Sequence, residues 1–231
     1  MIRKSLIALC GAVFALAGGP TTAALAKPGT KVTVRVEGAA HTLLAPKTIH
    51  THAGSIAKGG APKGACLATS GAGALDVATH HRWDGKYSAS LHDFFITKIL
   101  GEYESGTKTF WEIFVNNVAA STGACGLKLH RGDQLLFAAV SATAKAVYPV
   151  GLKGSHRVKV GKRLNLRVVY YDAKGKAHPL AGATVKAGSL TATSNSHGVV
   201  HFVPTHVGRL VVRANKTGYV RAAPLRVRVT K

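Results

Sequence analysis

The segment Thr109-Phe-Trp-Glu-Ile-Phe-Val-Asn-Asn117 decides the fold of the first half of the chain. Residues 109–115 are rich in aromatic and β-branched side chains and predict a strand, and the two asparagines that follow predict a turn. Alternation along the strand points two sets of side chains in opposite directions: Trp111, Ile113 and Val115 one way, and Phe110 and Phe114 the other. We expect most of these aromatic side chains to lie in a core.

Other strands in this half are predicted by alternation or by apolar runs. Residues 32–37 alternate valine with polar residues, as a strand with one buried face does. Residues 94–100 predict a second strand, and residues 134–140, after a Gly132-Asp133 turn, predict a third. By contrast, residues 41–64 contain two prolines among Thr, His, Gly, Lys and Ala, which predicts a long irregular loop.

One short helix is expected between these strands. Thr69 or Ser70 can cap an alanine-rich segment in which Ala72 and Leu75 share a face. The segment Trp83-Asp84-Gly85 is expected to end that helix. The first half is therefore predicted to be a small α+β unit.

The same residues carry a resemblance to a known family. The pattern of Trp111 on a strand, Asn116 in the turn and then Gly132-Asp133 resembles the domain family related to the C-terminal domain of transcobalamin. The likeness covers about Lys31 to Val140 and implies a compact α+β domain of the β-grasp type, often exported. In transcobalamin this domain closes over cobalamin only together with a large helical barrel, and this sequence holds no such barrel. The resemblance therefore implies little about activity, and a corrinoid-like ligand held with a partner is an alternative. The chain departs from the pattern at Asn117, where a glycine is usual, and in its long histidine-rich insertion.

The second half is predicted to be an all-β sandwich of short strands separated by turns. The expected strands are residues 157–160, 163–171, 183–187, 190–193, 199–203, 209–214 and 225–229. Its segments 179–185, 195–200 and 208–211 resemble bacterial immunoglobulin-like and carboxypeptidase-regulatory-like modules. Such modules usually serve as stalks or adhesive spacers in exported proteins.

The expected fold is therefore mostly β: a small β-grasp-like α+β domain followed by an all-β immunoglobulin-like sandwich. The predicted divisions are 1–26, 27–148 and 149–231. The boundary is expected within residues 144–154, where Pro149 and two glycines interrupt the strand patterns.

The first 26 residues have the features of a cleaved signal peptide. Arg3 and Lys4 precede an apolar run of residues 6–18, and Ala24-Leu25-Ala26 supplies the small-x-small pattern at a cleavage site. The run is shorter than the ~20 residues of a membrane-spanning helix. An uncleaved anchor and a lipoprotein acylated at Cys10 are the alternatives. No later segment is apolar enough to predict a membrane span, and we expect a secreted, extracellular or cell-envelope-associated protein.

Cleavage would remove Cys10 and leave Cys66 and Cys125. In an oxidising compartment, two cysteines usually form a disulfide. Such a bridge would stabilise the fold by about 4 kcal/mol in the chain-entropy treatment. Two separate buried thiols are the alternative.

Positive charge is concentrated in the second half. Residues 27–150 carry 13 Lys and Arg against 8 Asp and Glu, whereas residues 151–231 carry 16 against one, Asp172. Such an excess attracts nucleic acid, wall polymers, acidic polysaccharides or anionic lipids, although it also serves solubility alone.

The best candidates for binding an anion lie on or near the last strand. On residues 225–229 the apolar side chains are expected to face the core while the arginines project outward, with two further arginines nearby. The four candidates are Arg213, Arg221, Arg226 and Arg228. The alternative is an edge strand that charge protects from aggregation.

The sequence offers little support for a catalytic activity or a bound cofactor. His50 and His52 could share a strand face with His80, His81 or His41 nearby, but no carboxylate or thiolate is spaced to complete a metal site. Nucleophile-elbow, Walker-type and zinc-protease motifs are missing from the sequence. We therefore expect neither catalytic residues nor a metal or other cofactor, although a secreted hydrolase assembled from distant residues stays an alternative.

The expected function is that of an exported, non-catalytic binding or adhesion protein of the cell envelope or medium. Its partner would be an anionic envelope polymer or surface that the cationic second half favours, since the sequence holds no dedicated nucleic-acid motif. The alternative is a small-molecule carrier for a corrinoid-like ligand, or an accessory domain that acts with a partner.

Overall fold

The computed structural model describes residues 29–105, 107–144 and 147–231. The predicted leader at 1–26, its predicted cleavage site and Cys10 lie outside these residues. The structure consists of short sheets with one helix and confirms the expected mostly-β class. Among the described residues, no helix has the length and apolar character needed to cross a membrane.

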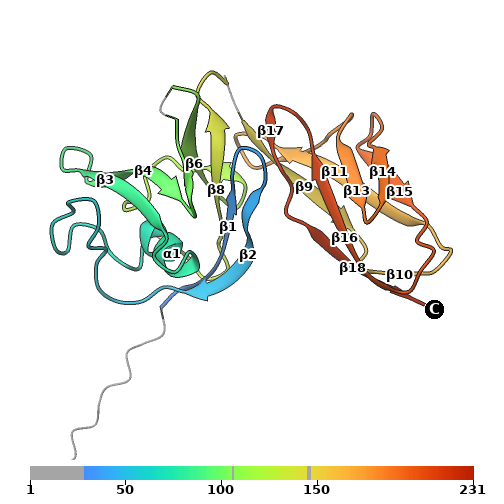
Figure 1. Cartoon of the computed structure of the whole chain (residues 1–231), viewed down its shortest axis with the longest axis horizontal. Coiled ribbons are helices and arrows are strands. Elements are labelled where there is room, and N and C mark those ends of the chain that lie inside the picture. The colour runs from blue at the N-terminus through green and yellow to red at the C-terminus, as the bar shows by residue number, and fades with distance from the viewer. Residues whose placement is uncertain (1–28, 106, 145–146) are drawn as a thin grey trace, which may run out of the picture.

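A five-stranded sheet forms the frame of the first half (Figure 1). Its strand order is β2-β1-β8-β6-β7. Neighbours pair antiparallel except β1 and β8, which are parallel. The bounds are β1 Lys31–Glu37, β2 Thr42–His50, β6 Thr109–Val115, β7 Val118–Ala119 and β8 Gln134–Ser141. Strand β8 reads as a nearly continuous apolar run because both of its faces are covered.

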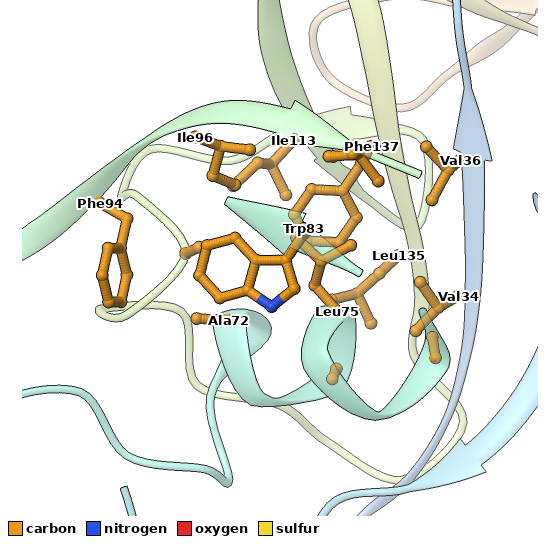
Figure 2. Packing of buried hydrophobic residues seen from close by; sticks show 14 of the residues in the cluster. Val34, Val36, Ala72, Leu75, Trp83, Phe94, Ile96, Ile113, Leu135 and Phe137 are labelled. Atoms are coloured by element: carbon orange, nitrogen blue, oxygen red, sulfur yellow. The ribbon is translucent and has the colours of Figure 1, made fainter. Parts of the chain in front are cut away.

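One face of this sheet packs on helix α1, Gly71–Ala78, and on a smaller sheet. That sheet has the order β3-β4-β5, with β3 Trp83–Ser88, β4 Asp93–Ile99 and β5 Glu102–Tyr103. Figure 2 shows the indole of Trp83 surrounded by apolar side chains from α1, β1, β4, β6 and β8. The Trp83 and Phe94 rings meet edge to face, with centroids 5.2 Å apart.

Two further sheets form the second half. One has the order β10-β18-β16-β13-β14, and the other has the order β12-β11-β9-β17 with β15 also paired to β11. Apolar side chains from both sheets fill a common core, as in a sandwich. The bounds are β9 Tyr148–Gly154, β10 Arg157–Lys159, β11 Leu164–Tyr171, β12 Ala177–Pro179, β13 Thr184–Ala187, β14 Leu190–Thr193, β15 Val199–Phe202, β16 Gly208–Asn215, β17 Tyr219–Val220 and β18 Leu225–Thr230.

A third apolar cluster joins the two halves. Phe114, Leu136 and Val140 lie on the sheet face opposite α1, where Val220 of β17 packs against them. The opposed directions predicted for Trp111 and Phe114 are confirmed, since the former lies in the α1-side core and the latter in this cluster. The division at 148/149 stays a prediction, although separate cores do occupy the two halves.

Three local expectations were wrong. Residues 42–50 form strand β2 instead of a loop. Its Pro46 is tolerated because β2 is an edge strand, paired to β1 with register shifts. The helix ends at Ala78, so Trp83 starts β3 instead of ending the helix. Strand β9 runs through Pro149 and both nearby glycines, which therefore do not interrupt a strand.

The helix start was predicted correctly. Ser70 is the N-cap, and its hydroxyl accepts from the backbone N–H of Gly73. The Asn116-Asn117 turn is also confirmed, because both residues have positive φ (51° and 71°) and join β6 to β7. This geometry is the two-residue hairpin turn that asparagine tolerates.

Candidate functional site

The outer face of the sheet β10-β18-β16-β13-β14 is strongly basic. Inward residues of these strands are apolar and lie in the sandwich core, so the alternate residues point to solvent. We call this surface the cationic face. Its seven exposed cations are Arg157, Lys159, Lys186, Arg209, Arg213, Arg226 and Arg228. None of the seven forms an ion pair with a described acidic group.

Strand register places cations directly opposite one another. Arg228 of β18 lies between Arg157 of β10 and Arg209 of β16, so three guanidinium groups follow one another across three strands. Lys186 of β13 faces Arg213 of β16 in the same way. Neighbouring strands are about 4.8 Å apart, and like charges in opposite positions destabilise a sheet. This arrangement therefore has a cost in folding free energy that a bound anion would offset.

A groove of about 470 Å³ lies over β16 and β18. Its lining includes Arg209, Arg226, Arg228, His156 and Val211. Val211 lies opposite Arg226 and two residues from Arg209 on β16. Nδ1 of His156 lies 3.1 Å from the backbone carbonyl oxygen of Arg226. The groove thus combines three guanidinium groups with a small apolar contact.

The structure brings three of the four predicted anion-binding residues, Arg213, Arg226 and Arg228, onto the cationic face. The fourth, Arg221, lies at the junction between the halves and pairs with Glu37. Sequence reasoning missed the other cations of the face: Arg157, Lys159, Lys186 and Arg209. The alternating Arg157-Val158-Lys159 was a usable signal, but only the strand order shows that it adjoins β18.

The junction is built around the buried Glu37 carboxylate, whose residue is 1% exposed. Arg35 donates from Nη1 to Oε1 of Glu37 at 2.9 Å, and Arg221 donates from Nε to Oε2 at 3.1 Å. Thr42 donates its hydroxyl to the same carboxylate. Burial lowers the pKa of Arg35 from its ordinary value, while the adjacent Glu37 opposes that shift.

Backbone acceptors complete this junction. Arg35 Nη1 donates to the carbonyl oxygen of Arg221 at 2.8 Å. The Arg221 guanidinium donates to the carbonyl oxygens of Gly38 and Ala39. Hydrogen bonds therefore run in both directions between β1 and the segment after β17. Together with the apolar cluster around Phe114, they fix the second half against the first.

The residues of the family motif have structural roles. Asn116 Nδ2 donates to Asp133 Oδ1 at 2.9 Å, and the Gln134 N–H donates to Asn116 Oδ1 at 3.0 Å. Gly132 has a φ of 96°, which explains a glycine at that turn. Trp111 is buried in the first core. The motif thus joins two turns and fills a core, and it does not gather into a ligand site.

The structure contains the expected disulfide between Cys66 and Cys125, whose Cα atoms are 5.0 Å apart. It connects the loop before α1 to the loop before β8. The Asp93 carboxylate accepts from the backbone N–H groups of Cys125 and Gly126, which fixes the second of these loops. The disulfide and the hydrogen bonds of Asp93 together hold these two loops against the first core.

The histidines do not assemble a metal site. His81 Nδ1 lies 2.6 Å from Oδ2 of the buried Asp76, and His80 Nε2 lies 2.9 Å from Lys47 Nζ. His50 ends β2, while His52 bonds the neighbouring backbone. Within the part of the chain that the structure describes, no group of three or more His, Cys, Asp or Glu could hold a metal ion.

A more apolar cleft of about 280 Å³ lies beside the junction. Phe110, Glu112, Phe114 and Asp172 are among its lining residues. Burial raises the pKa of the Glu112 carboxyl. The cleft is slightly smaller than the ~300–1,000 Å³ of typical small-molecule sites, and a corrinoid ring system is larger than a typical ligand of such sites. The cleft alone is therefore too small to enclose a corrinoid, and the alternative of a carrier that acts with a partner stays a prediction.

Comparison with known proteins adds one match. A family model described as a domain of unknown function (DUF4430) matches residues 71–140. No curated protein matches the chain. The matched range begins at α1, ends within β8 and includes the motif residues Trp111, Asn116, Gly132 and Asp133. It covers the first half only in part and does not reach the cationic face.

Proposed function

We propose that this protein is an exported, non-catalytic binding protein that attaches to anionic polymers of the cell envelope or medium through its cationic face. The observation that carries the proposal is the cationic face itself, where seven exposed cations share one sheet surface and none pairs with an acidic group among the described residues. A surface of one charge sign raises the local concentration of oppositely charged polymers and speeds their association.

The opposite side of the sandwich provides a contrast. On the outer face of β9 and β11, Lys153 and Arg167 are the exposed cations in opposite positions. The acidic residue of this half, Asp172, lies at the turn after β11 and bonds His178 at 2.7 Å. Seven of the 16 Lys and Arg of residues 151–231 thus share the cationic face, where strand register sets several of them directly opposite one another, while the other nine lie elsewhere. This grouping favours a binding role over general solubility.

The first half would be the part that the cationic face holds near the envelope. We also propose that the first half is a member of the transcobalamin C-terminal-domain family that it resembles, and that the sandwich is an immunoglobulin-like module. Export is supported by the leader pattern of residues 1–26 and by the Cys66–Cys125 bridge, which oxidising compartments favour.

Salt-dependent retention tests the proposal. The chain lacking residues 1–26 is passed over phosphocellulose and eluted with rising sodium chloride, and the double variant Arg213→Gln/Arg226→Gln is compared with Lys153→Gln/Arg167→Gln. Both variants lose two positive charges. We expect the first to elute at clearly lower salt and the second to elute near the parent chain. Equal elution of the two variants would contradict a role for the cationic face.

Localisation is tested separately in the producing cells. Cells and medium are fractionated, and the cell fraction is washed with high salt. We expect the protein in the medium or released from the envelope by the wash. Recovery in the cytoplasm with residues 1–26 still attached would contradict export.

A further inference from the structure

We propose that the groove over β16 and β18 binds a polyol phosphate polymer, a chain in which phosphodiesters alternate with short polyol units. This inference rests on the proposed function and names the ligand class of the same face. Phosphate groups would contact Arg209, Arg226 and Arg228, and a polyol unit would lie over Val211.

The choice of cation favours phosphate. Five of the seven cations on the face are arginine, whose planar guanidinium donates two parallel hydrogen bonds to an anion. Arg157, Arg228 and Arg209 approach one region from three adjacent strands. A carboxylate has two oxygens in one plane and can accept from two guanidinium groups, as Glu37 does from Arg35 and Arg221, but its donors approach within or near that plane. A phosphodiester has oxygens arranged tetrahedrally, so it can accept from guanidinium groups on different sides.

The spacing favours phosphates that an organic unit separates. Arg226 and Arg228 are two residues apart on one strand, about 6.8 Å along it. Val211 lies opposite Arg226, and Arg209 lies opposite Arg228. The groove therefore has three charged corners and one apolar corner. Adjacent phosphates of an inorganic polyphosphate share a bridging oxygen and leave no organic unit for Val211 to contact.

The same surface argues against nucleic acid. Single strands are held by bases stacked on aromatic rings as well as by phosphate contacts. Among the described residues that line the groove, there is no Phe, Tyr or Trp. The exposed rings of Phe95 and Tyr103 belong to the small sheet of the first half. Bases would therefore find no Phe, Tyr or Trp ring to stack on in the groove.

The test compares three polymers by titration calorimetry, each at two salt concentrations: poly(glycerol phosphate), poly-L-glutamate and oligo(dT). The protein is the full chain without residues 1–26. Four proteins are titrated: the parent, Arg209→Gln/Arg228→Gln, Arg209→Lys/Arg228→Lys, and the control Lys153→Gln/Arg167→Gln. The lysine variant keeps the charge of the groove but loses the two-pronged geometry of arginine.

We expect poly(glycerol phosphate) to bind the parent at least about tenfold more tightly than the other two polymers. The Gln variant of the groove should lose about tenfold or more of that affinity, the Lys variant should lose the preference for phosphate over glutamate, and the control should keep both. Circular dichroism of each variant checks that it is folded.

Each failure has a distinct meaning. Equal binding of poly(glycerol phosphate) and poly-L-glutamate, or a Lys variant with the parent's preference, would overturn the phosphate inference and leave the proposed function standing. Tighter binding of oligo(dT) would overturn it in favour of nucleic acid. Salt-independent binding, or no binding of any polymer, would refute the proposed function itself.

Discussion

Replacement of Glu37 by glutamine is expected to destabilise the protein strongly. The Glu37 carboxylate is buried and accepts hydrogen bonds from Arg35, Thr42 and Arg221. Glutamine keeps the size of the side chain but removes its negative charge, and its NH₂ group would meet donors. The buried Arg35 would then keep its charge with no carboxylate beside it. Breaking a buried ion pair from one side costs about 3–5 kcal/mol.

Thermal unfolding measures this cost. For a chain of this size, 1 kcal/mol corresponds to about 2–4 °C in the melting temperature, so Glu37→Gln should lower it by roughly 6–20 °C. Both tryptophans, Trp83 and Trp111, lie in the first core, so their fluorescence reports the unfolding of the half that contains Glu37.

A matched control removes a carboxylate that has little structural role. The Asp84 side chain is 64% exposed and lies 3.9 Å from Lys98, so Asp84→Asn should change stability by less than about 1 kcal/mol. A Glu37→Gln protein that melts within a degree of the Asp84→Asn protein would refute the view that this ion pair fixes the junction.

Three other outcomes are expected. Arg228→Thr should raise the free energy of unfolding by about 0.2–1 kcal/mol at low salt, because it removes repulsion from cations on both neighbouring strands. Urea denaturation at two salt concentrations measures this gain, and a loss of stability would contradict it. Cys66→Ala/Cys125→Ala should cost about 2–5 kcal/mol by the same assay, and an unchanged midpoint would contradict a stabilising bridge. The pKa of Asp172 is lowered mainly by its hydrogen bond from His178. The stability that the Asp172 carboxylate contributes is therefore complete above its unfolded pKa of about 4 and is lost as the pH falls through the lower folded pKa. In pH-dependent unfolding, Asp172→Asn should lose less stability than the parent over that acid range, and identical acid profiles of the two proteins would contradict this.

Much of the local structure could be predicted from the sequence. The strand at residues 109–115 and its asparagine turn were predictable because alternation and turn chemistry act over a few residues. Alternation on β18 likewise predicted that Arg226 and Arg228 face outward. The cysteine pair followed from counting, once the predicted leader was set aside.

Features that depend on distant pairing could not be predicted. Glu37 and Arg221 are separated by 184 residues, and no local pattern indicates that they meet. The row of arginines across β10, β18 and β16 depends on strand order and register, which alternation alone does not specify. Edge strand β2 was missed because an edge position tolerates the proline and polar residues that otherwise indicate a loop.

The Cys66–Cys125 bridge also affects what a protease can do to this protein. The closed ring spans 59 residues and contains α1 and strands β3 to β7, including the exposed loops between them. One cleavage anywhere inside the ring leaves the two pieces covalently joined, with the strands on both sides still held in place. A nicked molecule would migrate as one species until a reductant separates it into two, and its cationic face would stay attached to the rest of the protein.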